Sequence, residues 1–136
     1  MRRVVLDANV YVSALLAPTG SPAQILERWA DGQFDVIVSP LLLAELERVL
    51  RRPKFKRSIP TLQVDALLGA LAEEGISAAD PEARPGTTPD PGDDYLVALA
   101  RAANAECIVS GDTHLAQLSD PKPPVLTPHD FRNTLG

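Results

Sequence analysis

The chain is poor in several residue types and patterns, and each shortage excludes a class of protein. A single cysteine, Cys107, cannot form an internal disulfide or a cysteine-rich zinc site, and its apolar neighbours predict a buried strand position. No apolar run approaches the roughly 20 residues that span a bilayer. Asp7 interrupts the first apolar segment before it could serve as a signal peptide. We therefore expect a cytoplasmic protein that does not enter a membrane.

An excess of basic charge is also missing. The chain has 13 basic and 18 acidic residues, and its net charge of −5 argues against a protein that grips nucleic acid over its whole surface. The basic groups are unevenly spread, because five of them occupy seven positions at Arg51, Arg52, Lys54, Lys56 and Arg57. This basic segment, residues 51–57, fits either a solvated helix end or a surface that contacts RNA phosphates or an acidic protein segment.

The remaining composition is that of an ordinary globular protein. The 136 residues are 45% hydrophobic and 23% charged, and this length corresponds to one domain of about 150 residues. We therefore expect a single domain over residues 1–136.

Short apolar runs alternate with helical patterns along the chain. The runs predict strands at residues 4–6, 35–38 and 107–109, with a weaker candidate at 124–126. Helices are predicted at residues 10–16, from Pro22 after a Ser21 N-cap, and at 41–52, 62–74 and about 92–104. Four prolines and two glycines make residues 80–92 a loop. This alternation is typical of an α/β fold with a parallel sheet.

Three aspartates lie where such a fold places its ligands. Asp7 and Asp112 each follow a predicted strand, and ligands of open α/β sheets bind beyond the carboxyl ends of the strands. Asp94 falls in the first turn of the last long helix, where an acid also suits the helix dipole. Any one of them could be structural, so only their joint placement indicates a site.

Glu45 is a fourth candidate acid. Its helical neighbours include Leu41, Leu42 and Val49, so the carboxylate is expected against an apolar stripe, where it needs a partner. Arg48 is expected to point outward instead. Several carboxylates that gather without a cation repel one another, and an all-oxygen site suits Mg²⁺ or Mn²⁺. Such an ion can activate water and neutralise charge on a phosphate, which points to phosphodiester hydrolysis.

Four motifs, in this order, resemble those of the PIN-domain nucleases. They are Val-Val-Leu-Asp7-Ala-Asn9-Val-Tyr-Val-Ser13, Ser39-Pro-Leu-Leu-Leu-Ala-Glu45-Leu, Asp93-Asp94-Tyr-Leu-Val-Ala-Leu-Ala and Ile108-Val-Ser110-Gly111-Asp112. The chain is most similar to small bacterial PIN proteins regarded as toxins of toxin–antitoxin pairs. In those proteins a linker like Val49-Leu-Arg-Arg-Pro-Lys-Phe55 also occurs.

The resemblance implies a three-layer α/β/α sandwich around a mainly parallel sheet, with a divalent-metal site that cleaves single-stranded RNA. It assigns the metal-binding and catalytic roles to Asp7, Glu45, Asp94 and Asp112. Asn9 and Ser110 match the polar positions that steady the first and the last of these acids. RNA, an antitoxin and a second copy of the chain are the expected partners. Asp90 and Asp93 crowd the third motif.

Two other functions remain open at this point. A haloacid-dehalogenase-like phosphatase also has an acid after its first strand, but it needs a second aspartate where this chain has Asn9. A catalytically silent PIN module would bind RNA or a protein without cleaving anything. Trapping an aspartyl-phosphate would indicate the phosphatase, and metal binding without turnover would indicate the silent module.

Overall fold

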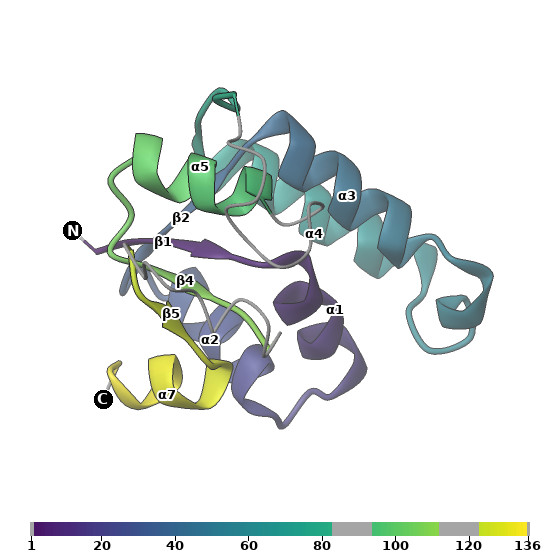
Figure 1. Cartoon of the computed structure of the whole chain (residues 1–136). Helices are drawn as coiled ribbons and strands as arrows, with labels where there is room; N and C mark the ends of the chain where they lie inside the picture. The colour runs from purple at the N-terminus through teal and green to yellow at the C-terminus, as the bar shows by residue number, and fades with distance from the viewer. Residues whose placement is uncertain (1, 83–93, 112–122, 136) are drawn as a thin grey trace.

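A computed structural model of the chain describes residues 2–82, 94–111 and 123–135 (Figure 1). Its centre is a five-stranded sheet in which every strand pairing is parallel. In the order β3-β2-β1-β4-β5 across the sheet, the strands are Ile76–Ser77, Asp35–Val38, Arg3–Leu6, Cys107–Val109 and Val125–Leu126. The three strands predicted most clearly from the sequence are therefore the three central ones.

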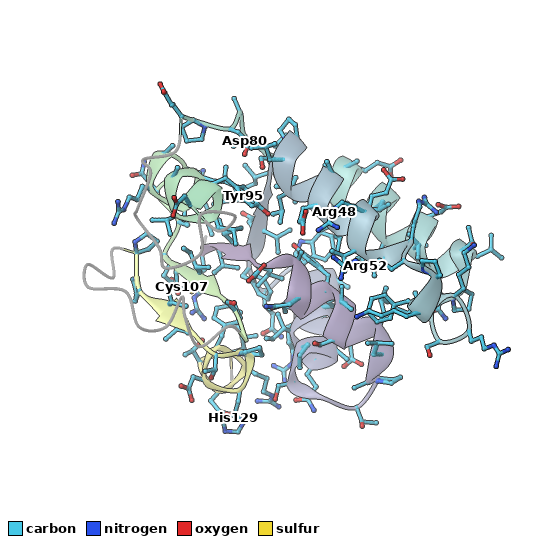
Figure 2. All side chains as sticks on the ribbon, turned by 45° about the vertical axis from the view of Figure 1, so that its right-hand side comes forward. Arg48, Arg52, Asp80, Tyr95, Cys107 and His129 are labelled. Carbon is cyan, nitrogen blue, oxygen red and sulfur yellow. The ribbon has the colours of Figure 1, made fainter. Side chains whose placement is uncertain are left out.

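The central strands are apolar on both faces because helices cover both sides of the sheet. In β1, Val4 and Leu6 face one core while Val5 faces the other, and all three are fully buried. Their register opposite β4 pairs Val5 with Ile108. A strand buried on both faces has no polar alternation. Cys107 is buried in β4 as predicted (Figure 2).

Helices form the two outer layers of the sandwich. In the described residues they are α1 (Ala8–Leu16), α2 (Ser21–Ala30), α3 (Pro40–Leu50), the 3-10 turn η1 (Pro53–Phe55), α4 (Thr61–Glu74), α5 (Asp94–Ala102) and α7 (Pro128–Asn133). The first core contains buried residues of α1, α2, α3, α4 and α7, whereas α5 supplies four of the nine buried residues of the second. The predicted three-layer α/β/α fold is confirmed. No helix in these parts of the chain is long and apolar enough to cross a membrane.

Local signals explain where most helices begin and end. The hydroxyl of Ser39 accepts a hydrogen bond from the backbone N–H of Leu42, and Pro40 opens α3. Ser21 was predicted as an N-cap but is the first residue of α2, which Gly20 caps. The predicted helix over 41–52 ends at Leu50, because the chain turns into η1 at Pro53.

Two short elements were not predicted, and two predictions are described only in part. Both β3 and α7 were missed; each is short, with two and six residues. The helix predicted at about 92–104 appears as α5, and residues 92 and 93 lie outside the described residues. The predicted loop over 80–92 is described only as far as residue 82.

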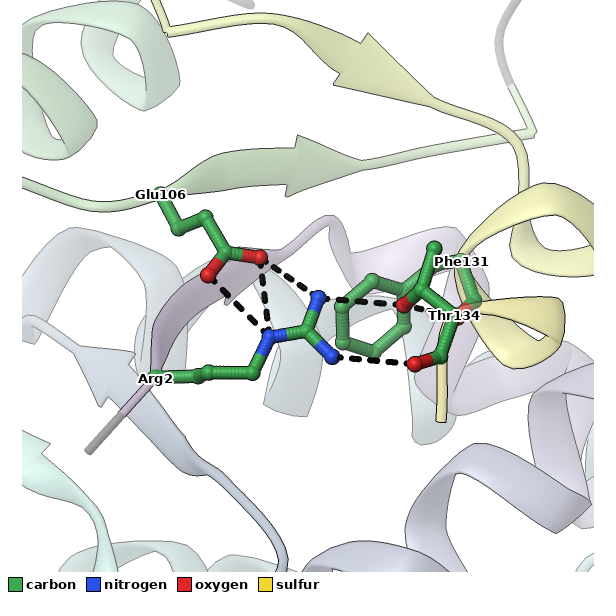
Figure 3. A network of polar contacts seen from close by, with 4 residues as sticks. All are labelled: Arg2, Glu106, Phe131 and Thr134. Carbon is green, nitrogen blue, oxygen red and sulfur yellow. Dashed lines mark hydrogen bonds and ion pairs between the residues drawn. The ribbon is translucent and has the colours of Figure 1, made fainter. Parts of the chain in front are cut away.

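Arg2 connects three distant segments at the amino-terminal edge of the sheet (Figure 3). Its guanidinium donates to both carboxylate oxygens of Glu106, which precedes β4, and to the backbone oxygen and the hydroxyl of Thr134. The same group lies 5.2 Å from the ring centre of Phe131 in α7. This network fastens α7 to the end of the sheet opposite to Asp7.

Candidate active site

The carboxyl ends of β1 and β4 bring Asp7 and Ser110 together. The two strands are parallel neighbours, and the last residue of β1, Leu6, lies opposite Val109. Asp7 directly follows Leu6, and its backbone N–H donates to the carbonyl of Val109 at 2.9 Å. Residues at the same end of adjacent parallel strands share one edge of the sheet, which is where ligands bind in open α/β folds.

The carboxylate of Asp7 is buried and held by neutral donors. Asp7 is only 8% exposed. Its Oδ2 accepts hydrogen bonds from Ser110 Oγ at 2.8 Å and from Asn9 Nδ2 at 3.2 Å. Asn9 Oδ1 in turn accepts from the backbone N–H of Gly111 at 3.4 Å. Both side chains that donate to Oδ2 help to orient the carboxylate of Asp7.

Ser110 makes one contact that the sequence did not suggest, with Asp7. The resemblance related Asn9 to the first acid and Ser110 to the last, Asp112. In the structure the amide of Asn9 and the hydroxyl of Ser110 both donate to the first acid, Asp7. The reason is the strand pairing, which places Ser110 directly beside Asp7.

Asp94 lies in the first turn of α5 and is 5% exposed. A carboxylate at this position interacts favourably with the partial positive charge of the helix N-terminus. Another acid caps a helix in a way that the sequence did not indicate: Asp80 Oδ2 accepts from the backbone N–H of Leu41, at the start of α3. Asp80 is 39 residues away from Leu41, so no local motif connects the two.

Glu45 requires a correction. The sequence indicated a carboxylate against an apolar stripe with Arg48 pointing away from it. Instead, the guanidinium of Arg48 binds both carboxylate oxygens, with Nη2–Oε1 at 2.7 Å and Nε–Oε2 at 3.1 Å. The Glu45 side chain is 39% exposed. The pair forms because residues three apart on a helix lie on one face, and it keeps the carboxylate at the surface.

The convergence of all four acids stays a prediction, since Asp112 lies outside the described residues, as do Asp90 and Asp93. Within residues 2–82, 94–111 and 123–135, no three His, Cys, Asp or Glu side chains are close enough to hold a metal ion. Asp7, Glu45 and Asp94 therefore do not make a complete metal cage by themselves.

Comparison with known proteins identifies the family. Residues 3–114 match the PIN domain. The chain belongs to the PIN domain family. PIN domains are generally nucleases that use divalent metals, so family membership favours this fold and chemistry over the phosphatase alternative.

Two individual proteins resemble this PIN domain over most of its length. The uncharacterized protein MJ1680 of Methanocaldococcus jannaschii is 27% identical over 119 residues, which are 87% of this chain and 76% of that protein. A chain in the crystal structure of VapBC2 from Rickettsia felis, bound to a DNA fragment from their promoter, superposes with a TM-score of 0.64. That superposition covers 92% of this chain and 98% of the other, at 17% identity, and shows a shared fold.

The basic segment of this PIN domain forms the tip of a helical hairpin. Helices α3 and α4 lie side by side, and their connection, with η1, is on the side toward which β1 points (Figure 1). Arg51 is bound to two carboxylates, Glu47 at 3.0 Å and Asp65 of α4 at 2.8 Å. Lys54 lies over the ring of Phe55. Arg52 is half-buried, and the side chains that follow it in the segment, Lys54, Lys56 and Arg57, are exposed.

Proposed function

We propose that this PIN domain is a divalent-metal-dependent endoribonuclease that hydrolyses phosphodiesters of single-stranded RNA, and that it is the toxin of a toxin–antitoxin pair. One observation carries the nuclease part: Asp7, at the carboxyl edge of the sheet, is buried and oriented by Ser110 and Asn9. Groups that donate hydrogen bonds to a metal-binding carboxylate orient it toward the ion.

The donor set fits a hard divalent ion. Asp7, Glu45, Asp94 and Asp112 offer carboxylate oxygens only, which suits Mg²⁺ or Mn²⁺ better than zinc. When bound, such an ion neutralises charge on a phosphate oxygen and makes a bound water more acidic. The chain contributes the orientation: Ser110 and Asn9 fix Asp7, the N-terminus of α5 carries Asp94, and Glu45 closes the site and helps to orient the attacking water.

We assign the basic segment to substrate binding. Arg52, Lys54, Lys56 and Arg57 would contact RNA phosphates near the hairpin tip, which lies on the side toward which β1 points (Figure 1). Arg51 has a different role in this proposal, because its two carboxylate partners fasten α3 to α4. It would support the basic segment rather than bind phosphate as strongly as its neighbours.

The toxin assignment rests on the resemblance to PIN toxins and on the VapBC2 structure. An antitoxin protein would then be the physiological partner, and a second copy of the chain would complete a homodimer. Co-purification with the product of a short open reading frame beside the gene tests the first, and the molar mass in solution tests the second.

A cleavage assay tests the nuclease activity. The purified chain is incubated with structured and unstructured RNAs in Mg²⁺ or Mn²⁺, with a chelator control and the Asp7→Asn variant. Metal-dependent cleavage of unstructured RNA that Asp7→Asn abolishes is expected. Asp31→Asn, an exposed acid at the end of α2, is the matched control and should keep activity. Cleavage that survives in Asp7→Asn contradicts the site, and metal binding without turnover would indicate a silent module.

A further inference from the structure

Asp7 and Glu45 differ in the side chains that donate to them. Asp7 accepts from a hydroxyl and an amide, both neutral. Glu45 is held by the guanidinium of Arg48, which donates to both of its carboxylate oxygens. A cation that approaches Glu45 therefore meets a positive charge that is already in place.

We propose that Arg48 is a positioning residue that occupies Glu45 in the absence of a divalent cation and releases it when the cation binds. The proposal rests on the proposed function, since it takes Glu45 as one of the acids that hold the ion. In this proposal Arg48 competes with the ion for the carboxylate of Glu45, which lies three positions before it on the same helix.

The geometry disfavours simultaneous binding of Arg48 and a divalent ion by the Glu45 carboxylate. Arg48 binds side-on, with one nitrogen on each oxygen at 3.1 and 2.7 Å, which is the fork-to-fork arrangement that guanidinium and carboxylate prefer. A divalent ion on the same carboxylate would lie within a few ångströms of the guanidinium, and like charges at that distance repel. Binding of the ion therefore favours a rotamer of Arg48 that points away.

The energy of the pair is small enough for this exchange to be reversible. The side chains of Arg48 and Glu45 are 59% and 39% exposed, and ion pairs that are this exposed to solvent are weak. Rotamers of exposed side chains interconvert in picoseconds to nanoseconds. Arg48 thus prevents repulsion around Glu45 in the empty site without blocking it permanently.

Arg51 provides a matched comparison at the C-terminal end of the same helix. It forms an ion pair with Glu47 of α3, but it also binds Asp65 of α4. Neither of its partners belongs to the candidate site. Removing the charge of Arg51 changes the net charge by the same amount as removing that of Arg48, without freeing a candidate ligand.

Calorimetric titration with Mn²⁺ tests the proposal independently of RNA cleavage. Arg48→Gln should bind Mn²⁺ about two- to fivefold more tightly than the unsubstituted chain, which is the affinity equivalent of the pair's energy. Arg51→Gln should change the affinity less. In an Glu45→Gln background, Arg48→Gln should bring no further gain, because the competition has been removed. Thermal unfolding of each variant shows whether the fold is intact.

A second measurement follows Arg48 directly. In a ¹⁵N NMR titration with diamagnetic Mg²⁺, the Arg48 side-chain Nε–H resonance should shift on saturation, while that of Arg51 stays in place. Equal Mn²⁺ affinities for Arg48→Gln, Arg51→Gln and the unsubstituted chain would overturn the proposal, as would the absence of Mn²⁺ binding. If Arg48→Gln tightens Mn²⁺ binding but no RNA is cleaved, the proposed nuclease function fails while the competition stands.

Discussion

The hydroxyl of Ser110 donates to Asp7 Oδ2 at 2.8 Å across 103 positions of sequence. The contact exists because β1 and β4 are parallel neighbours, so that the residues after their last pairs meet at one edge. Sheet topology, rather than any local motif, therefore determines how the buried carboxylate of Asp7 is oriented.

Replacing Ser110 with alanine tests this orientation. Ser110→Ala leaves Asp7 with the Asn9 amide as its remaining described side-chain donor, and loss of a group that orients a ligand lowers metal affinity or activity about 10- to 100-fold. Mn²⁺ titration and RNA cleavage measure the effect. Ser77→Ala, at an exposed position in β3, is the control and should match the unsubstituted chain. An unchanged affinity in Ser110→Ala would show that the bond does not position Asp7.

Tyr11 offers a test of the core. Its side chain is fully buried and, among the described residues, its hydroxyl has no hydrogen-bond partner. Burial also raises the pKa of this phenol well above its usual range. Tyr11→Phe removes an unsatisfied polar atom and should leave the free energy of unfolding unchanged or raise it by about 1 kcal/mol. Urea denaturation measures it, and a clear loss of stability would reveal a partner such as a buried water.

Two glycines of the same region should respond in opposite directions to alanine. A Cβ at Gly75, which ends α4, would lie 2.5 Å from the carbonyl oxygen of Leu71 and 3.1 Å from Val38 Cγ2. Gly75→Ala should therefore cost about 1–3 kcal/mol. A Cβ at Gly69, within α4, meets nothing within 4 Å, and Gly69→Ala should stabilise by about 0.5–1 kcal/mol. Denaturation curves of the two variants measure these changes in stability. Equal changes for Gly75→Ala and Gly69→Ala would contradict the close packing around Gly75.

The ion pair between Arg2 and Glu106 predicts a pH dependence. The guanidinium of Arg2, mainly through its hydrogen bonds, lowers the pKa of Glu106 below its usual value. A carboxyl whose pKa is lower in the folded state stabilises the fold above its unfolded pKa, and this contribution disappears as the pH falls through the folded pKa. Arg2→Met should thus cost more stability near about pH 6 than near about pH 3. A difference that does not vary with pH would contradict the prediction.

Salt dependence tests the basic segment. If Arg52, Lys54 and Lys56 contact phosphates, replacing all three with glutamine should flatten the slope of log affinity against log salt by about 2 for single-stranded RNA. Binding is measured with Asp7→Asn so that the RNA is not cut. Arg51→Gln should flatten the slope less, since its partners are Glu47 and Asp65. Equal slopes for the triple variant and its parent would show that this segment does not contact RNA phosphates.

The central strands could be predicted because each is marked by its own run of apolar residues. Strands such as Val4–Leu6 are apolar at every position, a pattern that only burial on both faces explains. The edge strand β3 has one half-buried residue and one exposed residue, so no pattern marks it. In α7, Phe131 is the one buried residue, and a six-residue helix is too short to show a period.

In the candidate site, too, some features are marked in the sequence and others are not. Asp7 and Asp94 could be placed at the ends of their elements because strand ends and helix starts are marked in the sequence. The pairing of Arg48 with Glu45 could not, since residues at i and i+3 are close enough to interact whether or not their rotamers meet. The single domain over residues 1–136 and the full set of four acids stay predictions.

The contact between Arg2 and Thr134 places the two ends of the described chain beside each other, at the opposite end of β1 from Asp7 (Figure 3). A donor and an acceptor fluorophore attached at these ends would transfer energy efficiently in the folded protein and lose that transfer when the chain opens. Stability could then be followed inside a cell without a label near the carboxylates, and a short linker between the ends would permit circular permutation at the turn around Gly32.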